Sequence, residues 1–471
     1  MQLGSPDRKA LVAGIGISGI AAVRVLRDQG FQVAVSDQSS ASKMSEIIAE
    51  LTELGVSEIE TSGHSEAFFT GRDLIVVSPG VPLSLPVLQN AKMQGGEIIG
   101  EVELAVRLSD IDILALTGTN GKTTTVSLLG EIFESVGSSV FVGGNLGRPA
   151  VEMVGAEFDT AILELSSFQL EGVVNFQPRI AIILNLTPDH QDRYASTEDY
   201  LAAKMRICGG QERDDFLIVN YDDQKLREIG RDYQNRRQTG ESCPRVVFFS
   251  VEQELDLSGG SWVGDNIVIK TETLPGKKLD LRLKAPAVKL PGRHNRANYL
   301  AAFLTAVIFG LEEKAVLKGL QDFAGIAHRL EFVGTQAGVD YYNDSKATNI
   351  DAVIKAVESL QKPLLLLLGG YNKGADFSLL EEPLKGKLRS LIPFGPAAAE
   401  IVKQLPEYDR GLQALNLEAA LKKAVALAEP GDVVLLAPGC ASFDEFANYE
   451  ARGDRFRELV HQLKGTVPDE A

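Results

Sequence analysis

The chain has 471 residues, of which 44% are hydrophobic, and its formal net charge is -17 at pH 7. This length suits about three domains of ordinary size, and the negative charge argues against a nucleic-acid partner, because duplex binding usually needs a basic face. The three cysteines lie far apart, as in a protein of the reducing cytoplasm, and no stretch approaches the ~20 apolar residues that span a bilayer. We therefore expect a cytoplasmic protein without a membrane partner, and we also expect a monomer.

The first hundred residues begin with a strand, a glycine turn, a helix and a second strand. Residues 9–13 form an apolar run, three glycines follow within residues 14–19, and the strand predicted over residues 31–36 ends at Asp37. This pattern is the dinucleotide-binding fingerprint. Taken alone it points to a nicotinamide cofactor, and the alternatives are a diphosphate or ribose site of another nucleotide or a relic of the fold. A further strand within residues 73–80 ends in Ser-Pro-Gly, where ligands gather in open parallel sheets.

A phosphate-binding loop is predicted where the apolar run of residues 113–116 leads into a helical pattern. Residues 117–123 read TGTNGKT. The two glycines let the backbone curl so that its N–H groups point at an anion, and the helix N-terminus adds positive charge. Lys122 can reach the terminal phosphates, and the Thr123 hydroxyl can bind Mg²⁺. The usual pattern has a glycine where Leu116 stands, so this loop is shortened, and an ordinary turn that opens a helix is the alternative.

Two more strands in the middle segment end in polar residues. The apolar run of residues 160–163 leads to Glu164, and that of residues 180–184 leads to a stretch with His190. Their ends are expected at the same sheet edge as the phosphate loop. A carboxylate is a ligand that Mg²⁺ prefers, so Glu164 is a candidate metal ligand, with helix capping or ion pairing as the alternative. His190 is a less natural magnesium ligand, and a hydrogen-bonded loop histidine is its alternative.

The rest of the middle segment is less specific. Lys204 lies in a helical stretch, where its spacing alone favours a solvated side chain. Residues 246–290 have a β-like pattern with tight turns, which predicts a small added sheet. Residues 291–298 then open a long alanine-rich helix that carries Asn295, for which capping is the alternative role.

The last segment contains three apolar strands, residues 339–342, 364–368 and 433–436, each followed by a polar cluster. Continuous apolar strands separated by helical stretches predict a parallel sheet covered on both faces. The strand ends offer two lysines and two hydroxyl groups, which suit a small anion with more than one carboxylate. The lysines are Lys346 and Lys373, and each of them taken alone is more often a solvated surface residue.

Together these motifs resemble the Mur ligase family, which builds the peptide of bacterial cell-wall precursors. The shortened phosphate loop is typical of that family, and the resemblance extends over nearly the whole chain. Two of the matching segments are typical of the members that add D-glutamate. The matching segments are residues 118–123, 164–171, 185–190, 294–295, 328–329, 344–349, 440–444 and 452–453, and the two D-glutamate segments are 344–349 and 440–444.

The resemblance implies an α/β fold with three domains, each built on a mainly parallel sheet. It implies a Rossmann-like UDP-binding domain over residues 1–101, a P-loop-type ATP-binding domain with a small extra β-sheet over residues 102–325, and a Rossmann-like amino-acid-binding domain over residues 326–471. The implied activity is that of an ATP-dependent amide-bond-forming ligase, an acid–D-amino-acid ligase of peptidoglycan precursor synthesis. It would add D-glutamate to UDP-N-acetylmuramoyl-L-alanine through an acyl phosphate, with ATP and two Mg²⁺ ions.

The resemblance also implies roles for individual residues. Those implied to contact the UDP substrate are Ser18, Gly19, Asp37, Ser78, Gly80, Asn145 and His190. Those implied to bind ATP are Gly118, Thr119, Asn120, Gly121, Lys122, Thr123, Thr124, Asn295 and Arg329. Those implied to hold D-glutamate are Lys346, Thr348, Lys373, Ser442 and Tyr449, where the last departs from the family's usual phenylalanine.

The catalytic and metal-binding residues that the resemblance implies overlap with these groups. The implied catalytic residues are Lys122, Glu164, His190 and Lys204, and the implied metal ligands are Thr123, Glu164, His190 and Lys204. Lys204 would act as a carbamate, which replaces a cation with a carboxylate-like anion that can support the second Mg²⁺.

Two other functions stay open at this point. A related ligase, such as a folylpolyglutamate synthetase, would keep the phosphate loop but not the UDP site, and the choice of acceptor discriminates it. A nicotinamide-dependent dehydrogenase would use the N-terminal fingerprint, would bind NAD(P)H, and would leave the second half of the chain without a role.

Overall fold

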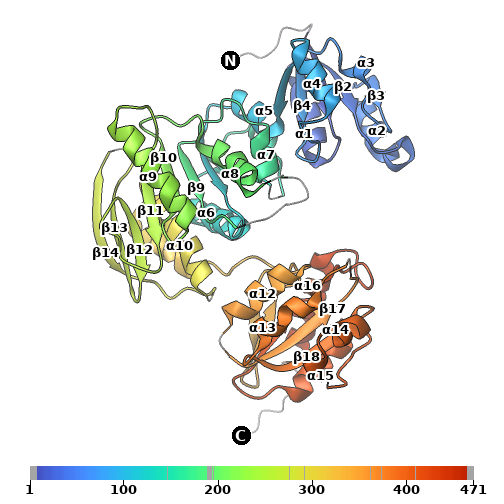
Figure 1. Ribbon diagram of the computed structural model, residues 1–471, viewed down its shortest axis with the longest axis vertical. Coiled ribbons are helices and arrows are strands. Elements are labelled where there is room, and N and C mark those ends of the chain that lie inside the picture. Colours follow the sequence, from blue (N-terminus) through green and yellow to red (C-terminus); the bar gives the residue numbers. More distant parts are fainter. Residues whose placement is uncertain are drawn as a thin grey trace. The chain divides into compact units, whose positions relative to one another are not determined.

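The computed structural model describes residues 8–145, 147–187, 194, 196–274, 276–290, 292–360, 362–372, 374–408 and 410–463. The chain divides into two compact units. Figure 1 shows its helices and strands, coloured along the sequence. The first contains the residues up to Pro286 together with Ala297–Leu320, and the second contains Ala287–Arg296 and the residues from Gln321 onward. Within the described ranges, no helix has the length and apolar character needed to cross a bilayer.

The first unit begins with a parallel sheet whose strands lie in the order β3-β2-β1-β4-β5. Successive residues of a strand point to opposite faces, so Val12 and Val76 pack into one core while Leu11 and Ile75 pack into another. Both faces are therefore covered, by the helices of this segment. The elements are β1 (Lys9–Ala13), β2 (Gln32–Ser36), β3 (Glu58–Glu60), β4 (Leu74–Val77), β5 (Glu97–Gly100), α1 (Ile17–Asp28), α2 (Ser45–Glu53), α3 (Glu66–Phe69), α4 (Pro86–Met93) and α5 (Glu101–Arg107).

A second, larger sheet follows in the same unit, with the order β14-β13-β12-β11-β10-β9-β6-β8-β7. Pairing is parallel from β7 to β12 and antiparallel from β12 to β14. The strands are β6 (Asp112–Thr117), β7 (Val140–Gly144), β8 (Thr160–Glu164), β9 (Ile180–Ile183), β10 (Phe216–Asn220), β11 (Arg245–Ser250), β12 (Gly259–Val263), β13 (Asn266–Glu272) and β14 (Lys278–Lys284).

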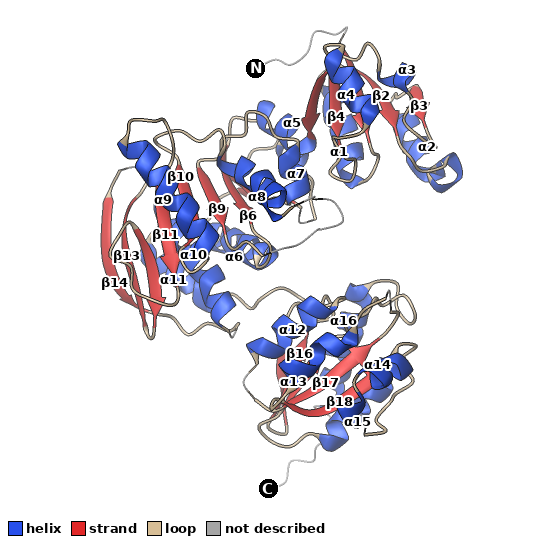
Figure 2. Cartoon of the chain, viewed as in Figure 1, coloured by secondary structure: helices blue, strands red, loops and turns tan. Residues whose placement is uncertain are grey.

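The segment predicted as a small added sheet thus continues the central sheet instead: β11 and β12 extend its parallel part, and β13 and β14 form an antiparallel edge. The chain reverses between β12 and β13 through a two-residue turn, in which Gly264 has a φ of +57°. Helices that accompany the central sheet are visible in Figure 2. They are α6 (Lys122–Ser135), α7 (Ser167–Glu171), α8 (Thr197–Met205), α9 (Gln224–Gln238), α10 (Arg293–Phe309) and α11 (Glu313–Asp322), of which the last two have residues in both units.

The second unit contains a sheet with the order β15-β16-β19-β17-β18, parallel except for the β15–β16 pair. Leu366 packs into the core on one face and Leu365 into the core on the other, as expected for a sheet covered on both faces. The elements are β15 (Glu331–Gln336), β16 (Val339–Asn343), β17 (Leu364–Gly369), β18 (Leu388–Phe394), β19 (Val433–Leu436), α12 (Ile350–Ser359), α13 (Glu381–Leu384), α14 (Ala398–Gln404), α15 (Leu417–Leu427) and α16 (Tyr449–Gln462).

The predicted fold class, an α/β protein with mainly parallel sheets, is confirmed by these three sheets. The domain boundaries after residues 101 and 325 stay predictions.

Candidate active site

The phosphate loop lies between β6 and α6 and curls as its glycine pattern predicts. Gly121 has a φ of +83°, and a Cβ atom on it would lie 2.3 Å from Asn298 Oδ1. The side chain of Asn185, which follows β9, pairs with the loop as a backbone strand would. Its Oδ1 accepts the Asn120 N–H at 2.8 Å, and its Nδ2 donates to the Asn120 carbonyl at 3.0 Å. These bonds brace the curled loop from within the protein.

Two lysine side chains converge on one carbonyl of this loop. Lys122 Nζ donates to Gly118 O at 2.9 Å and to Thr119 O at 2.8 Å. Lys204, on α8, is only 2% exposed and donates to the same Gly118 O at 2.9 Å. The solvated position that helical spacing favoured for Lys204 is therefore wrong. Two ammonium groups at one acceptor repel each other, so the arrangement favours an anion beside them.

Glu164 is the last residue of β8 and is paired in register with Leu116 at the end of the apolar part of β6. Its side chain is buried, and its Oε1 accepts from Asn145 Nδ2 at 2.9 Å. Oε2 has no hydrogen-bond partner among the described residues. A buried carboxylate oxygen is costly unless a cation or a donor satisfies it. This orphaned oxygen and the Thr123 hydroxyl at the start of α6 are hard ligands of the kind that Mg²⁺ takes.

Few side chains at this edge of the central sheet could bind a metal ion. The described ranges contain no group of three or more His, Cys, Asp or Glu side chains arranged to hold a metal ion. Mg²⁺ binding to a nucleotide usually relies on one or two protein oxygens together with the phosphates, so the set fits that mode. His190, the remaining candidate ligand, lies outside the described residues.

The N-terminal sheet has a pocket of about 420 Å³ where the strand order reverses between β1 and β4. Gly19 lies beside this pocket and allows α1 to approach the turn, since a Cβ atom on it would lie 2.1 Å from Gly14 O. The pocket lining includes four of the residues predicted to meet the UDP substrate: Ser18, Asp37, Ser78 and Gly80.

Asp37 also fixes the shape of this pocket. Its Oδ2 accepts the Ile15 N–H at 2.7 Å, and its Oδ1 accepts the Ser39 N–H at 2.7 Å. Burial acts to raise the pKa of Asp37, but these amide donors outweigh it and hold the pKa below its usual value. The ionised carboxylate thus braces the glycine turn after β1, in addition to the ribose contact that the sequence pattern predicts.

In the second unit, a buried arginine ties together the loops after β16 and β19. Arg452 is 1% exposed. It donates to Ser345 Oγ at 3.0 Å, to Ser345 O at 2.9 Å, and to the carbonyls of Cys440 and Ala441 at 3.1 Å each. Burial lowers the pKa of Arg452 to about 10, so it stays a cation at neutral pH. The two loops carry three of the residues predicted to hold D-glutamate, Lys346, Thr348 and Ser442.

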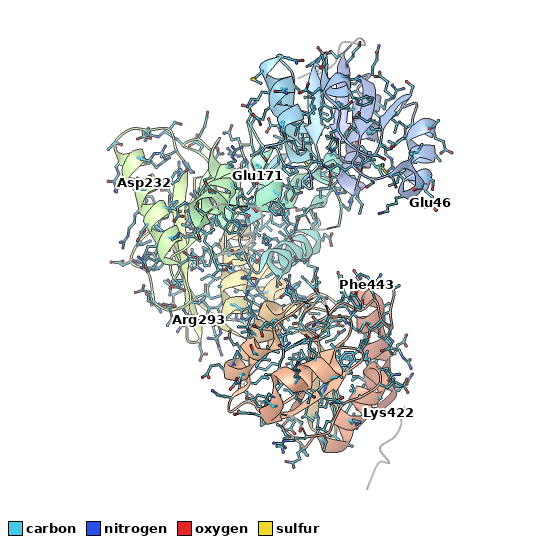
Figure 3. All side chains as sticks on the ribbon, turned by 45° about the vertical axis from the view of Figure 1, so that its right-hand side comes forward. Glu46, Glu171, Asp232, Arg293, Lys422 and Phe443 are labelled. Carbon is cyan, nitrogen blue, oxygen red and sulfur yellow. The ribbon has the colours of Figure 1, made fainter. Side chains whose placement is uncertain are left out.

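The side chains near these two loops include the cations Lys346 and Arg329, as expected of a site that binds an anion. Lys346 Nζ lies 5.5 Å from the ring centre of Tyr449. Asp344 is buried, and burial raises its pKa to about 7 against the opposing effect of Arg329 and Lys346. Arg329 Nη1 is buried and has no hydrogen-bond partner among the described residues, as expected of a group awaiting a ligand. Phe443, which follows Ser442, is 65% exposed at the surface of this unit (Figure 3).

Three family models match the chain. The Mur ligase MurD-like N-terminal domain matches residues 8–100, the Mur ligase middle domain matches residues 116–306, and the Mur ligase glutamate ligase domain matches residues 328–440. This chain belongs to the Mur ligase family. The nicotinamide interpretation of the N-terminal fingerprint is left without support, because the residues that carry it match the MurD-like N-terminal domain of this family.

Full-length relatives and solved structures agree with the family. The chain is 41% identical over 466 residues to UDP-N-acetylmuramoylalanine–D-glutamate ligase of Alkaliphilus metalliredigens, covering 97% of this chain and 99% of the relative. It is 43% identical over 463 residues to the protein of the same name from Acidobacterium capsulatum, covering 98% and 97%. A solved structure of MurF ligase from Thermotoga maritima in complex with ADP has a TM-score of 0.54 at 15% identity, covering 99% and 97%, which shows a shared fold.

The structure brings most of the predicted residues of this Mur ligase to the carboxyl ends of its strands. Lys373, like His190, lies outside the described residues, and Asn295 is buried in the first turn of α10. Three further residues were not predicted as site residues: Asn185, Arg452 and His64, which lines the N-terminal pocket. For Asn185 the signal was available, since it is a polar residue directly after an apolar strand.

Proposed function

We propose that this protein joins D-glutamate to UDP-N-acetylmuramoyl-L-alanine with cleavage of ATP to ADP and phosphate, in peptidoglycan precursor synthesis. The observation that carries the proposal is the identity of 41% and 43%, over nearly the full length, to relatives named for that reaction. The phosphate loop, the N-terminal pocket and the cationic loops of the second unit support it, because the three substrates need three such sites.

The first chemical step would activate the acceptor. A carboxylate oxygen of the alanyl group attacks the γ-phosphorus of ATP, the bond from that phosphorus to the bridging oxygen breaks, and ADP leaves with the electron pair. The product is an acyl phosphate. The curled loop and Lys122 would stabilise the negative charge on the transferring group, as in other phosphoryl-transfer sites. Lys122 already lies over its own loop, bonded to Gly118 O and Thr119 O.

The second step would form the amide. The amine of D-glutamate attacks the acyl carbon, a tetrahedral intermediate forms, and phosphate leaves with the electron pair while the amine loses a proton. Lys346, Thr348 and Ser442 would hold the carboxylates of D-glutamate, and Arg452 would keep their two loops in register. Tyr449 would complete this subsite beside Lys346.

Bound Mg²⁺ would neutralise charge on the phosphates during the first step. Thr123 and Glu164 would hold it, since Glu164 Oε2 is buried and has no partner among the described residues. We also propose that Lys204 is carbamylated. Its ammonium shares the Gly118 carbonyl with Lys122, and a carbamate would replace that repulsion with attraction.

The test is ATP-dependent incorporation of D-glutamate into UDP-N-acetylmuramoyl-L-alanine, with L-glutamate as the control substrate and orthophosphate release as the readout. Lys122→Ala is expected to lose roughly 10²-fold or more in rate, the scale of one lost transition-state charge contact. Lys92→Ala, an exposed lysine on α4, is the matched control and should keep the wild-type rate. Phosphate release with a folate acceptor alone would favour a folylpolyglutamate synthetase, and no release with either acceptor would overturn the proposal.

A further inference from the structure

His64 lies in the loop after β3 and lines the N-terminal pocket together with Asp37 and Gln38. Its Nδ1 lies 2.7 Å from Ser36 Oγ at the end of β2. The ring packs edge-on against Phe69, with ring centres 5.7 Å apart. The other ring nitrogen, Nε2, has no hydrogen-bond partner among the residues that the structure describes. The protein therefore holds one nitrogen of this pocket-lining ring, and the other makes no hydrogen bond within the described residues.

The hydroxyl group of Ser36 has one proton, and this decides whether Ser36 donates to His64 or accepts from it. Ser36 Oγ is buried and also lies 2.7 Å from Glu60 Oε2. Burial acts to raise the pKa of Glu60, but hydrogen bonds from Ser65 and Ser36 outweigh it and hold the pKa below its usual value. The ionised carboxylate and the Gly63 carbonyl, which lies 3.2 Å from Ser36 Oγ, can only accept, so the single hydroxyl proton of Ser36 goes to one of these two oxygens. Ser36 Oγ must then accept a proton from His64 Nδ1.

The hydrogen bonds that link His64 to Ser36 and Ser36 to Glu60 set the tautomer of His64. Burial lowers the pKa of His64 more than the nearby carboxylates of Asp37 and Glu60 raise it, so the ring is neutral at neutral pH. With its proton on Nδ1, the neutral ring has a lone pair on Nε2. The pocket thus presents a hydrogen-bond acceptor at this position and no donor.

We propose that His64 Nε2 accepts the N3–H of the uracil ring and so selects uridine over cytidine nucleotides. Uracil has a proton on N3, whereas cytosine has a lone pair at the same ring position, which an acceptor repels. A pocket that hydrogen-bonds one group rejects an analogue that lacks it, because the buried partner is then unpaired. The inference rests on the proposed function, which puts a uridine diphosphate in this pocket, and adds the residue that reads the base.

The experiment is calorimetric titration of the full chain with UDP, CDP and N3-methyl-UDP at about pH 8. Wild-type protein should bind UDP roughly tenfold more tightly than either analogue, the equivalent of one hydrogen bond. His64→Leu should lose roughly tenfold in UDP affinity and keep its CDP affinity within about twofold. His461→Leu, an exposed histidine on α16, is the matched control and should keep the wild-type preference.

A second variant protects the test against misfolding. His64→Gln offers both an acceptor and a donor, so its UDP and CDP affinities should become similar. A folded His64→Leu or His64→Gln protein, judged by its melting temperature, that keeps the wild-type ratio of UDP to CDP affinity would overturn the inference. Ligase activity with the UDP-linked acceptor would then leave the proposed function intact. Wild-type protein that binds no UDP and releases no phosphate would instead overturn both.

Discussion

Replacing Glu101 with glutamine tests how the start of α5 is anchored in the first unit. Glu101 follows β5 directly and is 2% exposed. Its Oε1 accepts the Val151 N–H at 2.7 Å, in the short 3₁₀ turn η2 (Ala150–Met153), while Oε2 has no partner among the described residues. Burial raises the pKa of this carboxyl to about 7, against a usual value of 4.5. Glutamine keeps the accepting oxygen and cannot ionise.

The expected effect is a change in the pH dependence of stability. The folded protein holds a proton on Glu101 that the unfolded chain releases above pH 4.5, so this contribution to stability is complete below pH 4.5 and is lost as the pH rises through about 7. A pKa difference of about 2.5 units corresponds to about 3 kcal/mol. Relative to Glu101→Gln, wild-type protein should therefore lose about 2–3 kcal/mol of unfolding free energy between about pH 5 and about pH 8.5.

The assay is urea unfolding followed by the fluorescence of Trp262, the single tryptophan, which is buried in β12. Glu103→Gln is the matched control. Glu103 is also buried, but it pairs with Arg107 at 2.8 Å, so its amide variant should be destabilised at both pH values. If the free-energy difference between wild type and Glu101→Gln is the same at both pH values, the reasoning about the buried proton is wrong.

Three further predictions concern the sites. Gly121→Ala should lower ATP affinity at least roughly tenfold, because its Cβ would meet Asn298 Oδ1 at 2.3 Å, and UDP affinity measured by the same titration should not change. Lys204→Ala should lose activity and regain part of it with short carboxylic acids that replace the carbamate, measured as phosphate release. Arg452→Lys should raise the KM for D-glutamate roughly tenfold, because a single ammonium nitrogen cannot reproduce the four hydrogen bonds that the guanidinium makes to the two loops.

Each of these has a clear contrary outcome. An unchanged ATP affinity in Gly121→Ala would mean that the loop does not need its positive φ. Full activity of Lys204→Ala without added acid would make Lys204 an ordinary buried lysine. A normal KM in Arg452→Lys would show that the two loops hold their positions without the guanidinium.

The sequence predicts the strands well because an apolar run bounded by polar residues has few other interpretations. The run of residues 113–116 became β6 (Asp112–Thr117), and that of residues 433–436 became β19 without change. The phosphate loop was predictable for the same reason, since all of its residues are adjacent in the chain. Its position at a strand end followed from the pattern of strand, glycines and helix.

The positions of Lys204, His64 and Arg452 depend on contacts between distant segments. Lys204 reaches Gly118 across 86 residues, and Arg452 reaches Ser345 across 107. No local period encodes such a contact, so helical spacing favoured an exposed Lys204 and said nothing of Arg452. His64 was overlooked because its tautomer depends on two residues at the ends of neighbouring strands, Ser36 and Glu60.

The antiparallel end of the central sheet has a consequence for how the protein behaves at high concentration. β14 is the outermost strand of that sheet as described, and its polar positions carry charges of both signs on Lys278, Asp280, Arg282 and Lys284. An open strand edge invites pairing with the edge of another molecule, and charged side chains along it, lysine above all, oppose such pairing. The charged side chains of β14 therefore help the ligase to resist edge-to-edge aggregation, although the edge of its long central sheet is open.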